Sequence, residues 1–152
     1  MREAIGQSFL VTLVAILVGV IMLVLVFSIV YSKTYKIKTK IVDIMEKYKG
    51  NENVYEAAHN EINEYLTGIG YKKNANSIQD CDPVNGVSAL NTLSETYRYC
   101  IYEFDSGEGL NRGKYYGVKV FIYFEFPIIG DILEIPVYGE TEVFFNNRYI
   151  EG

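Results

Sequence analysis

The sequence predicts an α+β protein in which a long N-terminal helix, a second helix and a three-stranded antiparallel sheet form one membrane segment and one small head. Three observations predict this fold. An uncharged apolar run extends from Phe9 to Tyr31, a helical pattern of apolar residues follows it without interruption, and strand patterns rich in Tyr and Phe fill the chain after residue 95. The predicted segments are a leader-like stretch at 1–8, a transmembrane helix at 9–31, an amphipathic extension at 32–49 and an α+β head at 50–152.

The apolar run from Phe9 to Tyr31 has 23 residues, and its polar side chains are Thr12, Ser28 and Tyr31. At about 1.5 Å per residue, it spans the roughly 30 Å hydrocarbon layer of a bilayer. A cleaved secretory signal usually has a shorter apolar region that ends in small residues, whereas this run continues into Ser32 and Lys33. We therefore expect a retained, single-pass membrane helix.

The helical pattern continues beyond the membrane segment, and no Pro or Gly interrupts it from Met22 to Lys49. We predict one helix from about Gly6 to Lys49, whose outer half lays an apolar stripe against the head. The stripe consists of Ile37, Ile41, Ile44, Met45 and Tyr48.

A second helix is predicted after the stop signal at Gly50, with Asn51 or Asn53 as its N-cap and its end at Gly68 and Gly70. One of its faces is apolar, which makes it a hairpin partner for the first helix. That face carries Val54, Ala58, Ile62, Tyr65 and Leu66.

Three strands are predicted in the rest of the head, at Glu95 to Phe104, Tyr115 to Phe126 and Leu133 to Phe145, with Pro136 suggesting an edge or a bulge. The connector 71–93 and the segments 105–113 and 127–131 are expected to be loops or turns. Nine aromatic residues exceed what one face of this sheet can bury, so we expect some to be exposed or to contact another subunit. They are Tyr97, Tyr99, Tyr102, Tyr115, Tyr116, Phe121, Tyr123, Phe144 and Phe145.

The net charge of −5 hides an asymmetry along the chain. Six lysines from Lys33 to Lys49 face two acids, which gives +4, whereas residues from Gly50 onward carry seven basic and sixteen acidic side chains, which gives −9. An acidic head argues against nucleic acid as a partner, because phosphate contacts require clustered Lys or Arg.

The chain carries two opposing indications of membrane orientation. Cytoplasmic flanks of membrane helices collect Lys and Arg, so the lysines from Lys33 to Lys40 would place the head inside the cell. Cys81 and Cys100 are the only cysteines, and a close pair in a small anchored domain suggests a disulfide in an oxidising space. The alternative is two unpaired thiols, with Cys100 packed in a strand and Cys81 in a loop. Sequence alone leaves the orientation open.

The residue types needed for catalysis are sparse, so we expect no enzyme activity, no cofactor, no metal and no small-molecule substrate. His59 is the only histidine, and we interpret it as a surface or helix-pair residue. The cluster of Asp80, Asp82 and Asn85 lacks the length of a calcium loop and is expected to be a solvated turn. The acid pair Glu140 and Glu142 is expected to discourage strand addition at a sheet edge.

The layout as a whole resembles the type IV pilin-like proteins. A short leader ending in Gly6, a long apolar helix running into an amphipathic one, and a small α+β head with a late cysteine pair carry the resemblance. The chain is most similar to the TadE-like minor pilins of tight-adherence pili, including small proteins of Gram-positive bacteria. The C-terminal stretch VFIYFEFPIIGDILEIPVYGETEVFF resembles their ending.

The resemblance implies a structural subunit of a pilus or of a secretion or adhesion apparatus, at the cell surface. Its partners would be membrane lipid and other pilin-like subunits or pilus assembly proteins, and its head would be extracytoplasmic. Gly6 would precede the processing cut and Gln7 would be the mature N-terminus; alternatively, Gly6 only starts the helix. Pilins usually carry a glutamate where this chain has Val11, and the leader has a single basic residue, Arg2. The rival hypothesis is a single-pass anchored binding or accessory module of a membrane complex.

Overall fold

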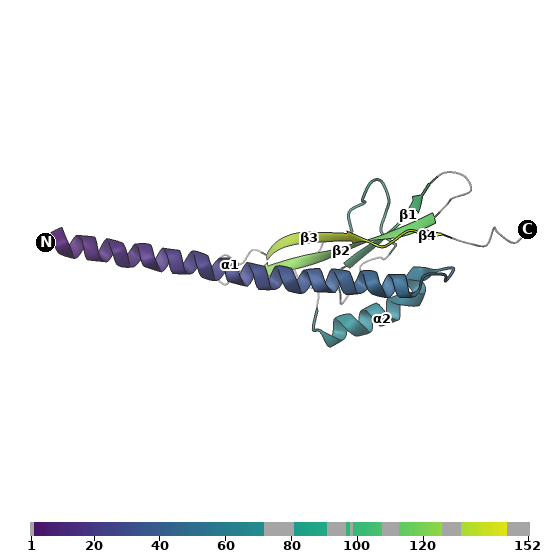
Figure 1. The fold of residues 1–152 in the computed structure, drawn as a ribbon, viewed down its shortest axis with the longest axis horizontal. Helices are drawn as coiled ribbons and strands as arrows, with labels where there is room; N and C mark the ends of the chain where they lie inside the picture. Colours follow the sequence, from purple (N-terminus) through teal and green to yellow (C-terminus); the bar gives the residue numbers. More distant parts are fainter. Residues whose placement is uncertain are drawn as a thin grey trace, which may run out of the picture. The chain divides into compact units, whose positions relative to one another are not determined.

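The structure is a computed structural model that describes residues 2–71, 81–90, 97, 99–107, 113–125 and 132–145, with side chains at all of these except 2–7, 122–125 and 132–134. Its elements in chain order are α1 (Arg2–Lys47), α2 (Val54–Gly68), β1 (Tyr99–Ser106), β2 (Gly113–Glu125), β3 (Ile132–Glu140) and β4 (Phe144–Phe145). Figure 1 shows this arrangement. The predicted α+β class is confirmed, with a long first helix, a second helix and an antiparallel sheet.

The chain forms two compact units, Met1–Lys33 and Thr34–Gly152. The first unit is the apolar part of α1, in which every described side chain from Ser8 to Ile29 is exposed. The hydroxyl of Thr12 donates a hydrogen bond of 3.0 Å to the carbonyl of Ser8 one turn earlier, so this polar group is satisfied within the helix. In the described part of the chain, α1 is the one helix long and apolar enough to cross a membrane.

In the second unit, the end of α1 buries one face against α2 and the sheet. Ile37, Ile41, Ile44 and Met45 are each at most 2% exposed, and Tyr48 at the end of the stripe is half-buried. The helix stops because Gly50 adopts a positive φ of 103°, which favours glycine. Asn53, one of the two predicted caps, accepts a hydrogen bond of 3.4 Å from the backbone N–H of Glu56 and starts α2.

The sheet has the strand order β1-β2-β3, and the short strand β4 also pairs with β2. The prediction of one strand from Leu133 to Phe145 is wrong, because β3 ends at Glu140 and β4 begins at Phe144. Glu140 pairs with Gly117 and Phe144 pairs with Lys114, so three residues lie opposite two on β2. The extra residue makes this interruption a bulge.

Thr141 holds the bulge together. Its backbone N–H donates to the carbonyl of Tyr116 at 2.9 Å, and its hydroxyl accepts the N–H of Tyr116 at 3.0 Å. The hydroxyl thus takes the place of the strand carbonyl that the bulge displaces. Asp105 and Ser106, expected in a turn, instead pair with Lys114 and Gly113 at the end of β1.

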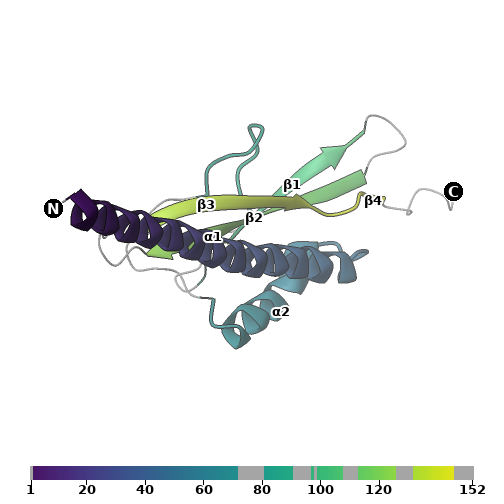
Figure 2. The ribbon, with the colours of Figure 1, turned by 60° about the vertical axis from the view of Figure 1, so that its left-hand side comes forward.

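Both faces of the sheet are covered, as Figure 2 shows, with α2 and the end of α1 on one side and the loop that contains residues 81–90 on the other. Tyr99, Ile101, Val118 and Val120 belong to the helix side. The loop side has its own cluster, formed by Cys100, Tyr102, Phe104 and Phe121.

Most of the nine aromatic residues are therefore buried, because the sheet has a second covered face on which they can pack. Six of the nine residues are at most 9% exposed, Tyr115 is half-buried and Phe145 is 59% exposed. The side chain of Tyr123 lies outside the described residues, as do the predicted turn at 127–131 and most of the connector 71–93.

Replacing Thr141 by Val should lower the free energy of unfolding by about 1–3 kcal/mol, because the buried N–H of Tyr116 then loses its acceptor. Urea unfolding of the full chain in neutral detergent, followed by near-UV circular dichroism of the tyrosines, measures the change. Thr39→Val is the matched control, since the buried hydroxyl of Thr39 has no hydrogen-bond partner in the described part of the chain. Equal midpoints for the two variants would contradict the role given to Thr141.

Candidate functional site

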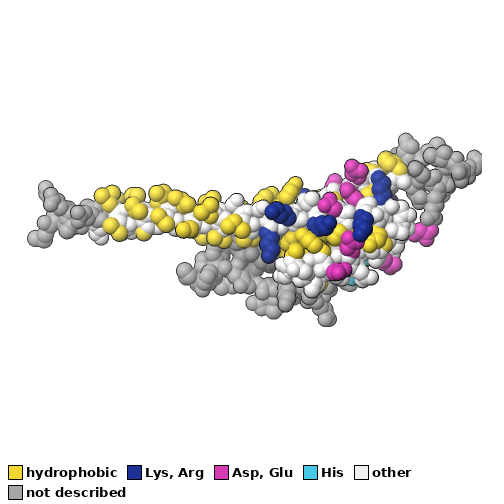
Figure 3. Space-filling model, turned by 60° about the horizontal axis from the view of Figure 1, so that its bottom comes forward, with side chains coloured by type: hydrophobic (Ala, Val, Ile, Leu, Met, Phe, Trp, Pro, Cys, Tyr) yellow, Lys and Arg dark blue, Asp and Glu magenta, His cyan; other side chains and the backbone are white. Residues whose placement is uncertain are grey.

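The apolar segment of α1 from Ser8 to Ile29 is exposed along its whole length. Phe9 is 68% exposed, Val11 is 70% exposed, and Tyr31 at the far end of the predicted span is 46% exposed. Figure 3 shows apolar side chains along the visible face of this segment. Gly6 and Gln7 both lie within α1, which begins at Arg2, so the helix runs through the predicted processing point.

An ion pair next to the buried stripe joins α1 to α2. The ammonium of Lys47 donates to the carboxylate of Glu61 at 2.6 Å, and the hydroxyl of Tyr48 donates to the same oxygen at 2.9 Å. The hydrogen bond from Lys47 contributes most, and that from Tyr48 contributes next, to holding the pKa of Glu61 below its ordinary value. The bond to Glu61 correspondingly raises the pKa of Lys47.

His59, on α2, contacts Tyr99 of β1 in a cluster of polar side chains. Its Nδ1 is 3.1 Å from the hydroxyl of Tyr55 and 3.3 Å from that of Tyr99, while its Nε2 is 2.9 Å from the amide nitrogen of Asn63. Burial raises the pKa of the Tyr99 hydroxyl, which keeps it neutral. The cluster joins two elements by hydrogen bonds, and the contacts of the histidine ring among the described residues are hydroxyl and amide groups.

The sequence interpretation missed this cluster. The spacing of Tyr55, His59 and Asn63, four residues apart, was available as a signal for one face of α2. The fourth member, Tyr99, is 40 residues from His59 in the chain and comes from a strand. No local pattern connects the two.

A disulfide joins Cys81 to Cys100 across 5.8 Å between their Cα atoms, which ties the loop 81–90 to β1. The loop is also held by hydrogen bonds from the hydroxyl of Tyr102 to the carbonyl of Asp82 and from the N–H of Leu90 to the carbonyl of Ile101, both 2.7 Å. The loop and its bridge therefore close the second face of the sheet.

The remaining predicted polar residues are exposed wherever the structure describes them. Asp82 and Asn85 are exposed in the loop, and Asp80 lies outside the described residues. Glu140 and Glu142 are exposed, and the backbone N–H of Glu142 donates to the carboxylate of Glu46 at 3.0 Å. Among the described residues, no three His, Cys, Asp or Glu side chains gather where they could hold a metal ion.

Reducing the Cys81–Cys100 bridge should lower the free energy of unfolding by about 3 kcal/mol, because the unfolded chain regains the freedom of a loop with a sequence separation of 19. The measurement is the urea midpoint of the full chain with and without reductant. A Cys100→Ala variant should have a midpoint that no longer depends on reductant. An unchanged midpoint for the reduced wild-type chain would contradict the structural role of the bridge.

The Glu61→Gln variant should lose less folding stability than the wild type when the pH is lowered. A carboxylate whose pKa is lower in the folded than in the unfolded chain stabilises the fold above its ordinary pKa of 4.5, and this contribution disappears as the pH drops through the folded value. The difference in unfolding midpoint between pH 7 and pH 3 should shrink in this variant. Glu64→Gln, on an exposed position of the same helix, is the control and should keep the wild-type difference.

No protein-family model, curated protein or solved structure matches this chain. The resemblance to pilin-like proteins therefore rests on the order and character of the chain's own segments.

Proposed function

We propose that this protein is a minor, TadE-like pilin subunit that is anchored by the apolar part of α1 and assembles through packing of that helix with helices of other subunits. One observation carries the proposal. Side chains from Ser8 to Ile29 are apolar and exposed almost throughout, whereas the same helix buries a regular stripe from Ile37 onward. The part of α1 from Ile37 onward is thus covered by the head, whereas the part from Ser8 to Ile29 needs lipid or another protein to cover it.

The exposed part needs an apolar environment on all of its sides. Fully burying a Val, Leu, Ile or Phe side chain is worth about 1.5–3 kcal/mol, so about twenty such residues in water would outweigh the stability of a small domain. Lipid supplies that environment to an isolated subunit. In a filament, neighbouring helices of the same kind would supply it after the subunit leaves the bilayer.

The bridged head supports an extracytoplasmic location. Disulfides persist in oxidising spaces outside the cytoplasm, and the bridge here ties down the loop that covers one face of the sheet. The lysines after the span argue for the opposite orientation by the positive-inside rule. The bridge is the stronger indication, because the cover of the loop face depends on it.

A minor rather than a major subunit fits the residue at position 11. Val11 stands where pilins usually carry the glutamate that pairs with a neighbour's N-terminus. This chain therefore lacks one of the attractions that align a major subunit with its neighbours. The same valine, with Arg2 as the only basic residue of the leader, favours a second candidate. That candidate is an unprocessed, single-pass binding or accessory module that stays in the bilayer.

Cysteine cross-linking along the exposed helix tests assembly. Single cysteines from Leu13 to Val24, oxidised in membranes while the native pair stays bridged, should give cross-linked dimers that recur every three to four residues, because one face of each helix meets its neighbour. Cysteines on the exposed face of α2, such as Asn60→Cys, are the control and should not follow this period. Absence of any periodic dimer would contradict assembly through this helix.

Two observations on the native protein separate the two candidates. A mature N-terminus at Gln7 supports a processed subunit, and an intact Met1 supports the membrane-resident module. Reduction followed by a membrane-impermeant thiol reagent should label Cys81 and Cys100 in intact cells. Labelling only after lysis would contradict the extracytoplasmic location of the head.

A further inference from the structure

We propose that Lys36, Lys38 and Lys40 form a basic collar around α1 that binds the headgroups of anionic phospholipids. The inference rests on the membrane-anchored part of the proposed function and is independent of assembly into a filament. It assigns these lysines a lipid partner, and it explains why they occur on the same side of the membrane as a disulfide-bonded head.

The lysines point to different sides of the helix. Successive residues of an α-helix are about 100° apart, so Lys36 and Lys40 share one flank and Lys38 lies near the opposite one. The structure agrees. A Cβ on Gly139 of β3 would lie 2.6 Å from the side chain of Lys38, whereas Lys40 lies close enough to Glu61 of α2 to help lower the pKa of that carboxylate.

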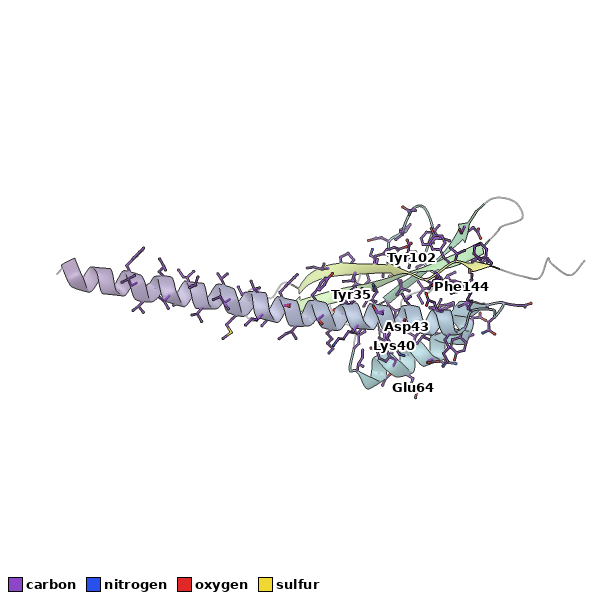
Figure 4. All side chains as sticks on the ribbon, in the orientation of Figure 1. Tyr35, Lys40, Asp43, Glu64, Tyr102 and Phe144 are labelled. Carbon is purple, nitrogen blue, oxygen red and sulfur yellow. A yellow bond between two sulfur atoms is a disulfide. The ribbon has the colours of Figure 1, made fainter. Side chains whose placement is uncertain are left out.

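An aromatic residue completes the collar on the β3 side. The ammonium of Lys38 lies 4.2 Å from the ring centre of Tyr35, which is 49% exposed. Figure 4 shows Tyr35 and Lys40 on different sides of α1. A ring of charges with a tyrosine at one level of a helix suits a flat surface that surrounds the helix, because a protein partner would contact only one side of it.

Glu61 compensates the collar's charges only in part, through Lys40. Lys36 and Lys40 are exposed and four residues apart, a spacing at which like charges repel. None of the three lysines forms an ion pair within 4.0 Å in the described part of the chain, whereas Lys47 and Lys114 both do. An anionic surface would turn this repulsion into attraction.

Position along the chain selects lipid over the acidic head of a second copy. Lys36 and Lys40 follow Tyr31 by five and nine residues, roughly 8 to 14 Å of helix. The potential of an anionic membrane extends about one Debye length, roughly 8 Å at physiological salt, and long lysine side chains add to their reach. Lys49, eighteen residues after Tyr31, is well beyond this distance.

The test uses the full chain in a neutral detergent and native mass spectrometry with equal amounts of phosphatidylglycerol and phosphatidylcholine. Phosphatidylglycerol should bind in clear excess, and the excess should fall with added salt. Lys36→Gln/Lys40→Gln should weaken phosphatidylglycerol binding by about five-fold for each lysine removed, because each is worth about a factor of five at the surface. Lys49→Gln is the matched control and should bind as the wild type does.

The same spectra report the competing occupant. Equal binding of the two lipids, or an excess that survives in the double variant, would overturn the headgroup site. Loss of dimers instead of lipid adducts in the double variant would assign the lysines to a second copy and would equally overturn it.

Flotation with vesicles of phosphatidylcholine alone separates this inference from the anchor itself. Wild type and double variant should both float, since the apolar segment alone inserts. Failure to float would reject the membrane anchor of the proposed function. Flotation of the wild type, together with mass spectra that show no preference for phosphatidylglycerol, would reject the collar alone.

Discussion

Burial of the stripe on α1 is the constraint on which the second unit depends. Ile41, Ile44 and Met45 fill the space between α2 and the helix side of the sheet, so the end of α1 forms part of the head's core. Removing it would expose the apolar faces of both α2 and β2, and a domain of this size has no second layer to replace it. Because that core segment belongs to the same helix as the exposed apolar segment, both belong to one continuous backbone element.

Local patterns were enough to predict the helical part of the fold. The stripe follows the period of a helix, and the cap at Asn53 depends on an N–H three residues away, so neither needs information from distant parts of the chain. The alternation of β2 is equally local. A helix long and apolar enough to cross a membrane, too, follows from length and composition alone.

The features that could not be predicted depend on contacts between distant residues. The break between β3 and β4 arises because the hydroxyl of Thr141 can replace a carbonyl for Tyr116, which no strand pattern reveals. The second covered face requires the loop at Cys81 to return to Cys100, so that Val84, Val87 and Ala89 pack against the sheet. The cluster at His59 is completed from β1. In each case the sequence gives the residue types, and only the pairing of distant strands and loops brings them together.

The continuity of α1, from its exposed apolar segment into the core of the head, is the feature on which the proposed function depends. Site-resolved amide hydrogen exchange of the full chain in lipid nanodiscs tests it most directly, because helical hydrogen bonds protect backbone amides whether lipid or protein covers them. We expect the backbone amides to be protected from exchange continuously from about Phe9 through Ile44, with no gap between Ser32 and Lys36. Fast exchange at Ser32 to Lys36, between two protected segments, would contradict it by showing an anchor and a head joined by an unfolded linker.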